Sequence, residues 1–578
     1  MKKIFFLFLL FFGIQLVSFG QAKKINFIGI ESLKLSTPKQ ANDSLSAIQI
    51  AREVLQGLHD LSFLSANIDS IKWLTKEIIV YLSPGEKYKW VRLRKGNLSQ
   101  QEIDAIDFSS RVYLGRPFNA KQLQNLFKKT IQHFENNGYP FASISLDSVS
   151  ILEKTRLKAS LHLEKNKKYL IDSIKITGNS GIDKDYLSTY LGIYEGMLYN
   201  ESKISNIDTR VREIPFITAK QRPQIHFFEN SVKIILDLKK KKASRFDGII
   251  GLLTNEGSGK IEFTGDVDLN LINAFNKGEN FGLNWRKLKG NSQDLNIDFL
   301  YPYLFKTPFA LDFDFKLYKQ DTTFLDLETR LGINYLLERG EYVSLFIENK
   351  SSTLLSRSTF LNTINPQIPS LGDLRINSFG IAYAGNKTDY KYNPTKGMNF
   401  NLLFSAGIKR LKKITELEEE QPNIYTDVEL KTNQYKGKLK AEFYIPIKSR
   451  STIKAANQSA TIYSENIYAN ELLRIGGLKI LRGFDEESIK VSSYSIFTLE
   501  YRFLLDRNSY FSIFGDQGIY ESRSENGYNQ GNPFGIGAGV SFETKAGIFT
   551  FNYAVGKQLG NPIEVRAAKI HFGFVNFF

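Results

Sequence analysis

The sequence contains no cysteine and only five histidines among its 578 residues. Without cysteine the chain can form no disulfide, no thiolate metal site and no lipid-modified cysteine anchor. The histidines are scattered without the spacing of metal ligands, at His59, His133, His162, His226 and His571. No nucleophile–base pair, phosphate-cradling glycine loop or carboxylate dyad stands out either. The sequence therefore indicates neither an enzyme nor a protein that holds a metal or cofactor.

Long apolar runs are also scarce. After residue 20, no segment reaches the roughly 18 consecutive apolar residues that a transmembrane helix needs. The start of the chain differs, because Lys2 and Lys3 precede an apolar run from Ile4 to Phe12 and small residues follow up to Gly20. This three-part pattern is typical of a secretory signal peptide, and the run is too short to span a bilayer. We predict that residues 1–20 are a signal peptide and that the rest of the chain is exported.

The composition leaves two kinds of protein open. Phenylalanine and tyrosine are frequent, with 45 and 28 residues, while the mean hydropathy is negative. A soluble protein rich in aromatic residues fits this composition, and so does a transmembrane barrel whose strands alternate apolar and polar residues. The net charge of +16 suits an anionic membrane surface or nucleic acid, but an exported barrel meets no nucleic acid. We expect membrane lipids, and no nucleic acid, among its partners.

Residues 22–240 mix helix and strand patterns. Ala120 to Asn137 carries apolar residues three and four positions apart, which predicts an amphipathic helix, and Gly138 follows where a C-terminal cap belongs. A further single helix is expected to bear Ile204, Ile207, Val211 and Ile214. Strand-like runs follow these helices, and a fainter helix and strand precede them. We therefore predict three small α+β modules in tandem, 22–86, 87–165 and 166–240, the first with the weakest pattern.

After Lys242 helical spacing gives way to strict alternation. Leu311, Phe313 and Phe315, for example, interleave with charged residues, so one face of the strand is apolar and the other is charged. Sixteen candidate strands follow this pattern, eleven before Glu471 and five after Val491, and the number is even, as in single-chain barrels. The pattern alone does not separate a soluble sandwich from a membrane barrel with a polar lumen. The signal peptide and the number and length of the strands favour a transmembrane antiparallel β-barrel over 243–578.

The C-terminal strand supports a barrel. Ile570, Phe572, Phe574 and the terminal Phe578 share one face of this strand, with Asn576 as the exception. Most outer-membrane barrels end in an amphipathic strand with a terminal phenylalanine, which serves as their recognition signal. We predict that Phe572, Phe574 and Phe578 form this signal.

The stretch between the eleventh and twelfth candidate strands contains RIGGLKILRGFDEES, and its marked residues are Gly476, Gly477, Arg482, Gly483 and Phe484. The next two strands carry an acidic residue each, Glu500 in FTLEYRF and Asp516 in FGDQG, and GIGAGVSFET and GIFTFNYAVGK follow. In this order and spacing, 390–578 resembles the Omp85 superfamily, barrel proteins that insert or export other proteins at outer membranes. PTKG, at 394–397, resembles a turn of the same barrels, and GYPFA, at 138–142, is similar to a junction in their POTRA domains.

The resemblance implies a role for the marked residues. In the family, the sixth extracellular loop folds back into the lumen, and its arginine meets acidic residues on the two following strands. Arg482 is thus expected to pair with Glu500 and Asp516, and a guanidinium inside a protein-filled lumen needs such carboxylate partners because an unpaired buried charge is costly. The resemblance further implies a weak seam between the first strand, near 245–253, and the last, near 569–578.

The resemblance also implies location, partners and function. The barrel would lie in the outer membrane with its POTRA modules in the periplasm, and three modules before sixteen strands most resemble the translocation-and-assembly branch. Its partners would be unfolded outer-membrane or secreted client proteins and outer-membrane lipids, with room for a periplasmic or inner-membrane tether. Two alternatives stay open: a two-partner secretion transporter, which usually has two modules and a plug helix, and a plain diffusion channel, which would need neither the arm nor the loop motif.

Overall fold

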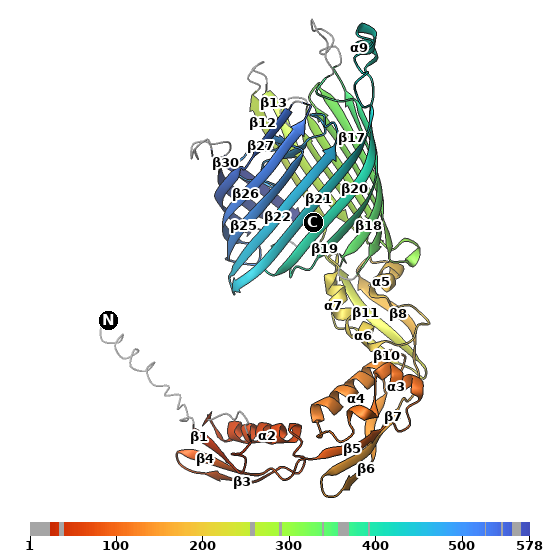
Figure 1. Ribbon diagram of the computed structural model, residues 1–578, viewed down its shortest axis with the longest axis vertical. Helices are drawn as coiled ribbons and strands as arrows, with labels where there is room; N and C mark the ends of the chain where they lie inside the picture. Colours follow the sequence, from red (N-terminus) through yellow and green to blue (C-terminus); the bar gives the residue numbers. More distant parts are fainter. Residues whose placement is uncertain are drawn as a thin grey trace, which may run out of the picture. The chain divides into compact units, whose positions relative to one another are not determined.

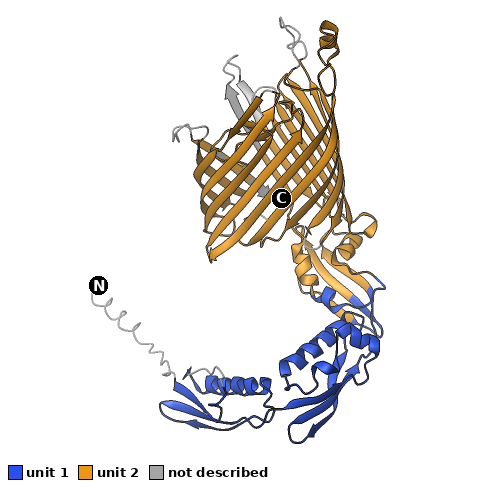
Figure 2. Cartoon of the chain, viewed as in Figure 1, with its two compact units in different colours: residues 1–172, 195–205, 227–233 blue, residues 173–194, 206–226, 234–578 orange. Residues whose placement is uncertain are grey.

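The computed structural model describes residues 23–577 except 34–39, 255–260, 288–291, 338–339, 357–368, 391–392, 526, 545–546 and 558–567. The predicted signal peptide, 1–20, and Phe578 lie outside the described residues. The chain divides into two compact units (Figure 2). One unit comprises residues 1–172, 195–205 and 227–233, and the other comprises 173–194, 206–226 and 234–578.

The first module is a four-stranded sheet covered by one helix. The sheet has the order β2 (Gln40–Ala41), β1 (Lys23–Ile28), β4 (Glu77–Ser83), β3 (Asn67–Trp73), and the helix is α2 (Ser44–Asp60). Asp43 caps this helix by accepting a hydrogen bond from the Ser46 N–H. The buried face of α2 packs on Ile78 and Val80 of the central strand, so the module has its own apolar core.

The second module repeats the arrangement with three strands. Its sheet has the order β5 (Lys89–Arg94), β7 (Arg156–Glu164), β6 (Ser143–Leu152), beside helices α3 (Gln100–Ile106) and α4 (Ala120–Glu135) and the short turn η1 (Ser110–Val112). Helix α4 confirms the amphipathic helix predicted from the sequence. It buries Leu123, Leu126 and Phe134. Gly138 follows it with a φ of +97°, a left-handed conformation that glycine adopts at little cost.

The third sheet has the order β10 (Gln224–Phe227), β11 (Ser231–Lys240), β8 (Leu170–Asn179), and β9 (Ile217–Ala219) also pairs with β11. It is accompanied by α5 (Lys184–Leu191), α6 (Glu201–Ser205) and α7 (Ile207–Glu213). The prediction of one helix across Ile204 to Ile214 was wrong, because α6 and α7 are separate and Ile214 is already extended. Pro215 follows Ile214 and disfavours helical geometry in the residue before it. The apolar spacing nevertheless marked residues that are buried.

The remaining strands form a closed barrel (Figure 1). Eleven precede its longest inward loop: β12 (Arg245–Thr254), β13 (Ile261–Ile272), β14 (Asn280–Lys287), β15 (Gln293–Tyr301), β16 (Phe309–Gln320), β17 (Phe324–Leu336), β18 (Tyr342–Leu354), β19 (Leu374–Asn386), β20 (Gly397–Leu411), β21 (Lys431–Lys448) and β22 (Ser451–Ser464). The others are β25 (Ser493–Leu504), β26 (Tyr510–Ser524), β27 (Gly527–Gly531), β28 (Phe534–Thr544), β29 (Gly547–Lys557) and β30 (Lys569–Phe577). Two short helices, η2 (Leu304–Lys306) and α9 (Thr415–Glu420), lie in connections between strands.

The described strands make a barrel of sixteen strand positions, each called a stave here, because β27 and β28 occupy one position. Strands β27 and β28 pair with successive parts of β26, so together they make one stave interrupted before Phe534. Neighbouring staves are antiparallel throughout, as between β16 and β17. The predicted architecture, small α+β modules followed by an antiparallel barrel of about sixteen strands, is confirmed.

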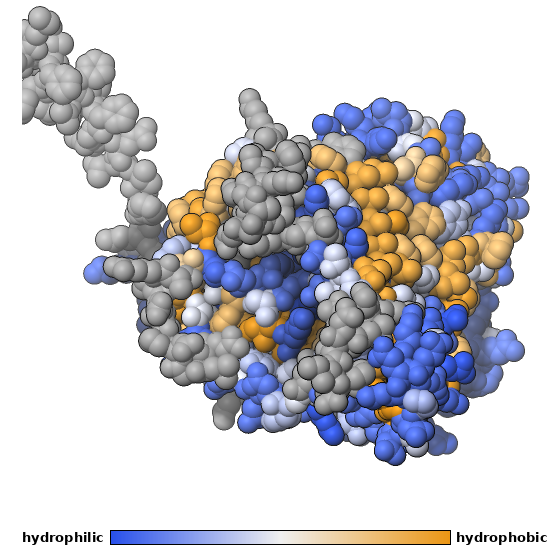
Figure 3. Space-filling view, turned by 90° about the horizontal axis from the view of Figure 1, so that it is seen from above, coloured by the Kyte–Doolittle hydropathy of each residue, from blue (hydrophilic) through white to orange (hydrophobic). Residues whose placement is uncertain are grey.

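Polar and apolar side chains of the barrel strands are arranged in the opposite way to those of a soluble protein, with the apolar side chains exposed and the polar ones buried. On β17, Leu331 and Ile333 are 44% and 54% exposed, whereas the neighbouring Asn334 is 1% exposed. Exposed apolar residues form a broad patch on the molecular surface in Figure 3. An apolar outside around a polar inside is the arrangement of a membrane barrel, and it answers the question that the alternation left open. Among the described residues, no helix is long and apolar enough to cross a membrane.

Helix α5 of the third module contacts two strand-connecting turns of the barrel within the second unit. The rings of Tyr186 and Tyr303 lie 5.3 Å apart. The Lys277 ammonium donates a hydrogen bond of 2.7 Å to the Asp183 carboxylate, which also caps the helix. Gly278, with a φ of +75°, admits the Tyr186 ring, because a Cβ there would lie 2.0 Å from a ring carbon. The joint therefore combines aromatic packing, one ion pair and a required glycine.

The ion pair gives this joint a predictable pH dependence. Burial acts to raise the pKa of Asp183, but hydrogen bonds from Lys277 and from the Tyr186 and Asp185 N–H groups hold it below the usual 3.8. The same pair raises the pKa of Lys277 above 10.5. A depressed carboxyl pKa stabilises the fold above the unfolded pKa, and this stability is lost as the pH falls through the folded pKa. We expect Asp183→Asn to lower the melting temperature at pH 7, and the difference between the two proteins to shrink as the pH falls below 3.8 and through the lower folded pKa of Asp183. A difference that does not shrink as the pH is lowered through this acid range would contradict this assignment.

Candidate functional site in the barrel lumen

The segment between β22 and β25, called here the lumen loop (465–492), folds as a compact unit. Strands β23 (Leu473–Ile475) and β24 (Ile489–Val491) pair within it, and its buried apolar residues include Ile475 and Leu481. The predicted glycine pair lies at the end of β23. Gly476 and Gly477 have φ values of +118° and +93°, and a Cβ on Gly477 would lie 1.7 Å from the carboxylate of Glu486. The pair is therefore needed to let the two arms of the loop lie against each other.

Arg482 joins the lumen loop to the barrel wall. Its Nε and Nη2 donate hydrogen bonds of 2.8 and 2.7 Å to the two carboxylate oxygens of Asp516 on β26. Its Nη1 donates one of 2.7 Å to Glu500 on β25. The guanidinium also lies 3.4 Å from the ring centroid of Phe514, and Arg482 as a whole is only 9% exposed. Such a two-pronged contact fixes both the position and the orientation of the loop.

Both acidic partners are held by further contacts. The Arg482 backbone N–H and the Thr498 hydroxyl also donate to Asp516, at 3.1 and 2.8 Å. Glu500 accepts a second hydrogen bond, of 2.7 Å, from Arg502. Two cations therefore share Glu500, and no carboxylate of this cluster faces the buried space without a partner.

Glycines in the wall let the loop approach closely. Gly483 has a φ of +92°, and a Cβ there would lie 2.7 Å from the Val555 backbone on β29. On the wall side, a Cβ on Gly535 would lie 2.0 Å from the Arg482 carbonyl oxygen, and one on Gly556 would lie 2.8 Å from the Phe484 ring. The Arg-Gly-Phe segment therefore packs directly against glycines of the barrel wall. These glycines belong to the segments GIGAGVSFET and GIFTFNYAVGK.

The last strand lies in an aromatic cluster. The Phe574 ring lies 4.6 Å from that of Phe549, and the Phe572 ring lies 4.9 Å from that of Phe551, both on β29. Phe578, the third residue predicted for the C-terminal signal, lies outside the described residues. The two described phenylalanines thus pack against the neighbouring strand.

The barrel closes weakly between its first and last strands. In the described residues, β12 pairs with β30 at Arg245 opposite Phe577 and at Phe246 opposite Asn576. On its other side β12 pairs with β13 along its whole length, from Arg245 to Thr254. We call this contact the seam. Its two pairs lie at the module end of the barrel, where the chain enters β12, so most of β12 lacks a described partner on the seam side.

A family model described as the Omp85 superfamily domain matches residues 273–578. This chain belongs to the Omp85 superfamily. A second model, POTRA, described as the surface antigen variable number repeat, matches 169–241, so this Omp85 chain has a POTRA module directly before its barrel.

Individual relatives of this Omp85 chain are distant. The outer membrane protein assembly factor BamA of Neisseria meningitidis serogroup B (strain ATCC BAA-335 / MC58) is 20% identical over 371 residues, which are 59% of this chain and 45% of that relative. The chain thus spans less than half of that relative's length. The solved structures of CdiB from Acinetobacter baumannii and from Escherichia coli each cover 92% of this chain and 97% of their own, with 14% identity and a TM-score of 0.52. At this identity the likeness shows a shared fold alone.

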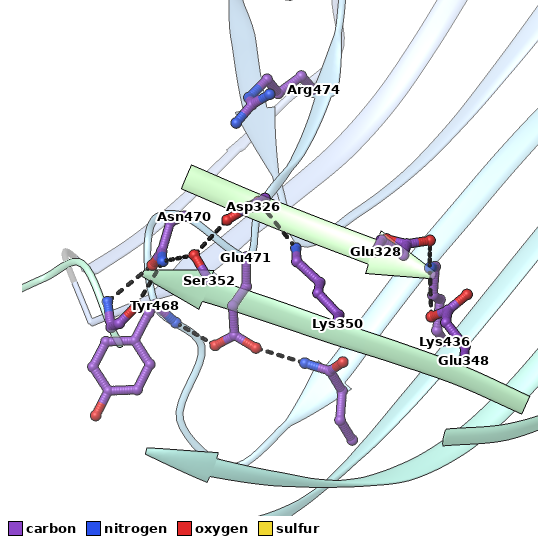
Figure 4. A network of polar contacts seen from close by, with 12 residues as sticks. Asp326, Glu328, Glu348, Lys350, Ser352, Lys436, Tyr468, Asn470, Glu471 and Arg474 are labelled. Carbon is purple, nitrogen blue, oxygen red and sulfur yellow. Dashed lines mark hydrogen bonds and ion pairs between the residues drawn. The ribbon is translucent and has the colours of Figure 1, made fainter. Parts of the chain in front are cut away.

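Sequence reasoning missed the residues that hold the start of the lumen loop in this Omp85 barrel, among them Asn470 and Glu471 (Figure 4). Glu471 accepts hydrogen bonds from Lys409 of β20 at 3.0 Å and from Gln434 of β21 at 2.6 Å. Asn470 donates to Ser352 of β18 at 2.6 Å. The side chains of Lys409 and Glu471 are 3% and 1% exposed, so this is a buried ion pair. No sequence spacing indicates these contacts, because the bonded residues are far apart in the sequence. Lys409 and Glu471 are separated by 62 positions, Gln434 and Glu471 by 37, and Ser352 and Asn470 by 118.

The lumen behind the loop is crosslinked as well. Lys436 of β21 donates hydrogen bonds to Glu348 of β18 at 3.0 Å and to Glu328 of β17 at 3.3 Å (Figure 4). Neither β17 nor β18 is a neighbour of β21 in the barrel sheet, so the contacts cross the interior. Among the described residues, no group of three or more His, Asp and Glu could hold a metal ion. The observed contacts of the Omp85 site are charge pairs that anchor the lumen loop to the barrel wall.

Proposed function

We propose that this chain assembles or translocates proteins at the outer membrane, with clients entering the membrane at the seam between β12 and β30. The observation that carries this proposal is the seam itself, where two residue pairs join strands of ten and nine residues. An unpaired strand edge offers N–H and C=O groups that another strand can pair with, whatever its sequence. An incoming client strand could therefore extend the barrel sheet at this position.

The arm supports capture of clients before insertion. We propose that 22–86 and 87–165 are POTRA modules like the one at 169–241, and that all of them lie in the periplasm. Strand β6 is an edge of the second sheet, and Val149 and Ile151 on it are both 55% exposed. A long edge strand with exposed apolar side chains suits the addition of an extended segment, with backbone hydrogen bonds supplying affinity.

The proposed location also assigns lipids as partners. Lys239 to Lys242, at the end of the arm, are exposed. At a membrane surface each such lysine adds about 1 kcal/mol of attraction to anionic headgroups. The proposal includes no catalysis and no cofactor, since the lumen site consists of charge pairs that are already satisfied by one another.

The proposal is tested by reconstitution. Purified full-length protein in lipid vesicles is expected to accelerate the folding of an unfolded outer-membrane barrel, measured as heat-modifiable migration on gels, over protein-free vesicles. Because the chain has no cysteine, single cysteines on β12 or β30 can be crosslinked to the client, with a cysteine on the distant strand β20 as the matched control.

Crosslinks confined to β12 and β30 would support insertion at the seam. Equal crosslinking from β20, or folding no faster than in empty vesicles, would contradict it. Export of one dedicated partner without folding of clients would instead indicate a two-partner secretion transporter.

A further inference from the structure

Three consecutive acidic residues, Asp485, Glu486 and Glu487, follow the Arg-Gly-Phe sequence in the lumen loop. They do not take part in the contact of Arg482 with Asp516 and Glu500. Their ion pairs instead reach strands on the two sides of the seam. This placement gives the lumen loop a third set of contacts with the barrel, besides those of Arg482 and those of Asn470 and Glu471.

On one side the loop contacts the last strand. The Asp485 carboxylate lies 2.7 Å from the ammonium of Lys569, the first residue of β30. Leu478 of the loop lies near the same strand, because a Cβ on Gly573 would be 3.8 Å from its side chain. Both contacts lie away from the C-terminal end of β30, where the two seam pairs are found.

On the other side the loop contacts the third strand. Glu487 accepts a hydrogen bond of 2.8 Å from Arg286 of β14, and Glu486 lies 3.9 Å from the same guanidinium. Arg286 is also paired with Asp294 on β15, at 2.5 Å, and its side chain is 20% exposed. The Arg286 guanidinium is therefore held on the barrel wall by a contact that does not involve the loop, and this lowers the entropic cost of its pairing with Glu487.

The position of these contacts complements the backbone pairing. Strands β12 and β30 are hydrogen-bonded only at the module end in the described residues, whereas Lys569 and Arg286 lie near the far ends of their strands. The loop that joins them is itself held on β25 and β26 by Arg482. Charge pairs thus span β30 to β14 over the part of the seam where the ladder is missing.

We propose that Asp485 and Glu487 form an ionic strap that holds the far end of the seam closed, and that its release lets β12 and β30 separate. This inference rests on the proposed function for its purpose, because a strap matters when clients enter at the seam. Ion pairs suit the task, since partly exposed pairs are weak individually and exchange readily with competing charges. A client or membrane surface bearing charged groups could therefore release the strap without unfolding the barrel.

The test measures the seam directly in the purified full-length protein. Spin labels on cysteines introduced at Thr254, the last residue of β12, and at Ile570 of β30 report the distance across the far end. Asp485→Asn with Glu487→Gln is expected to raise the population of wide separations by roughly threefold, which corresponds to the loss of weak ion pairs. The matched control is Glu418→Gln in α9, away from the seam. The Glu418 carboxylate lies 2.6 Å from the Lys413 ammonium. This control variant should leave the distribution unchanged.

Two further measurements keep the test decisive. Raising salt from about 10 mM to about 1 M shortens the screening length from about 30 Å to about 3 Å. This change should widen the wild-type distribution and leave the double variant as it was. Exchanging the two charges of one pair, with Asp485→Lys and Lys569→Asp together, should give the narrow distances of the wild type. An unchanged distribution in the double variant, or no salt response in the wild type, would overturn the strap. Failure of the proposed function is separate, because it appears as absent client folding by the wild type while the distances still respond.

Discussion

Arg482→Ala is expected to destabilise the barrel by about 3–5 kcal/mol, the usual cost of removing one partner from a buried ion pair. The substitution leaves the carboxylates of Asp516 and Glu500 on adjacent strands without the guanidinium that bridges them. Arg502 still donates to Glu500, but Asp516 keeps only the hydroxyl of Thr498 and the backbone N–H of residue 482. The measurement is the urea midpoint of the detergent-solubilised barrel, followed by heat-modifiable migration.

Lysine at position 482 should restore only part of this stability. An ammonium keeps the charge but cannot make the planar two-pronged contact with Asp516 or lie flat on the Phe514 ring. A matched control is Arg523→Ala, which removes an exposed arginine from the same strand as Asp516 and should shift the midpoint little. Equal midpoints for Arg482→Ala and Arg523→Ala would mean that Arg482 does not anchor the loop.

Lys409→Met is expected to cost about 3–5 kcal/mol as well, for a related reason at the other end of the lumen loop. It leaves the Glu471 carboxylate, whose side chain is 1% exposed, with hydrogen bonds from Gln434 and the Tyr468 N–H but no cation. The start of the loop should loosen. Trp285 is the only tryptophan in the barrel sequence, so its fluorescence can follow unfolding of the barrel in a protein whose other two tryptophans, Trp73 and Trp90, are replaced by phenylalanine.

The double variant Lys409→Met with Glu471→Met separates burial of a lone charge from loss of the pair. Replacing a buried ion pair by apolar side chains of similar size is often neutral or stabilising. We therefore expect the double variant to be more stable than Lys409→Met alone. A double variant that is less stable than the single one would show that the pair is worth more than apolar packing at this position.

The sequence by itself determined the faces of the barrel and the number of its staves. Side chains on a strand alternate with a period of two, so residues such as Leu331 and Asn334 are assigned to opposite faces by their positions alone. The motif order also predicted that Arg482 meets Glu500 and Asp516, and these side chains are hydrogen-bonded in the lumen. That prediction depended on a family resemblance, because no local rule connects residues on three different segments.

Only the tertiary structure decided which charges meet inside the lumen and where the barrel is weak. Lys409 and Glu471 are 62 positions apart, and Arg286 and Glu487 are 201 apart. Their pairing depends on how the lumen loop folds and on the curvature of the closed sheet, neither of which is written in local periodicity. The seam is likewise a property of closure, because nothing in the sequences of β12 and β30 shows how far along their length the two strands pair. Alternation specifies which way each side chain points, and only the three-dimensional fold specifies what it meets there.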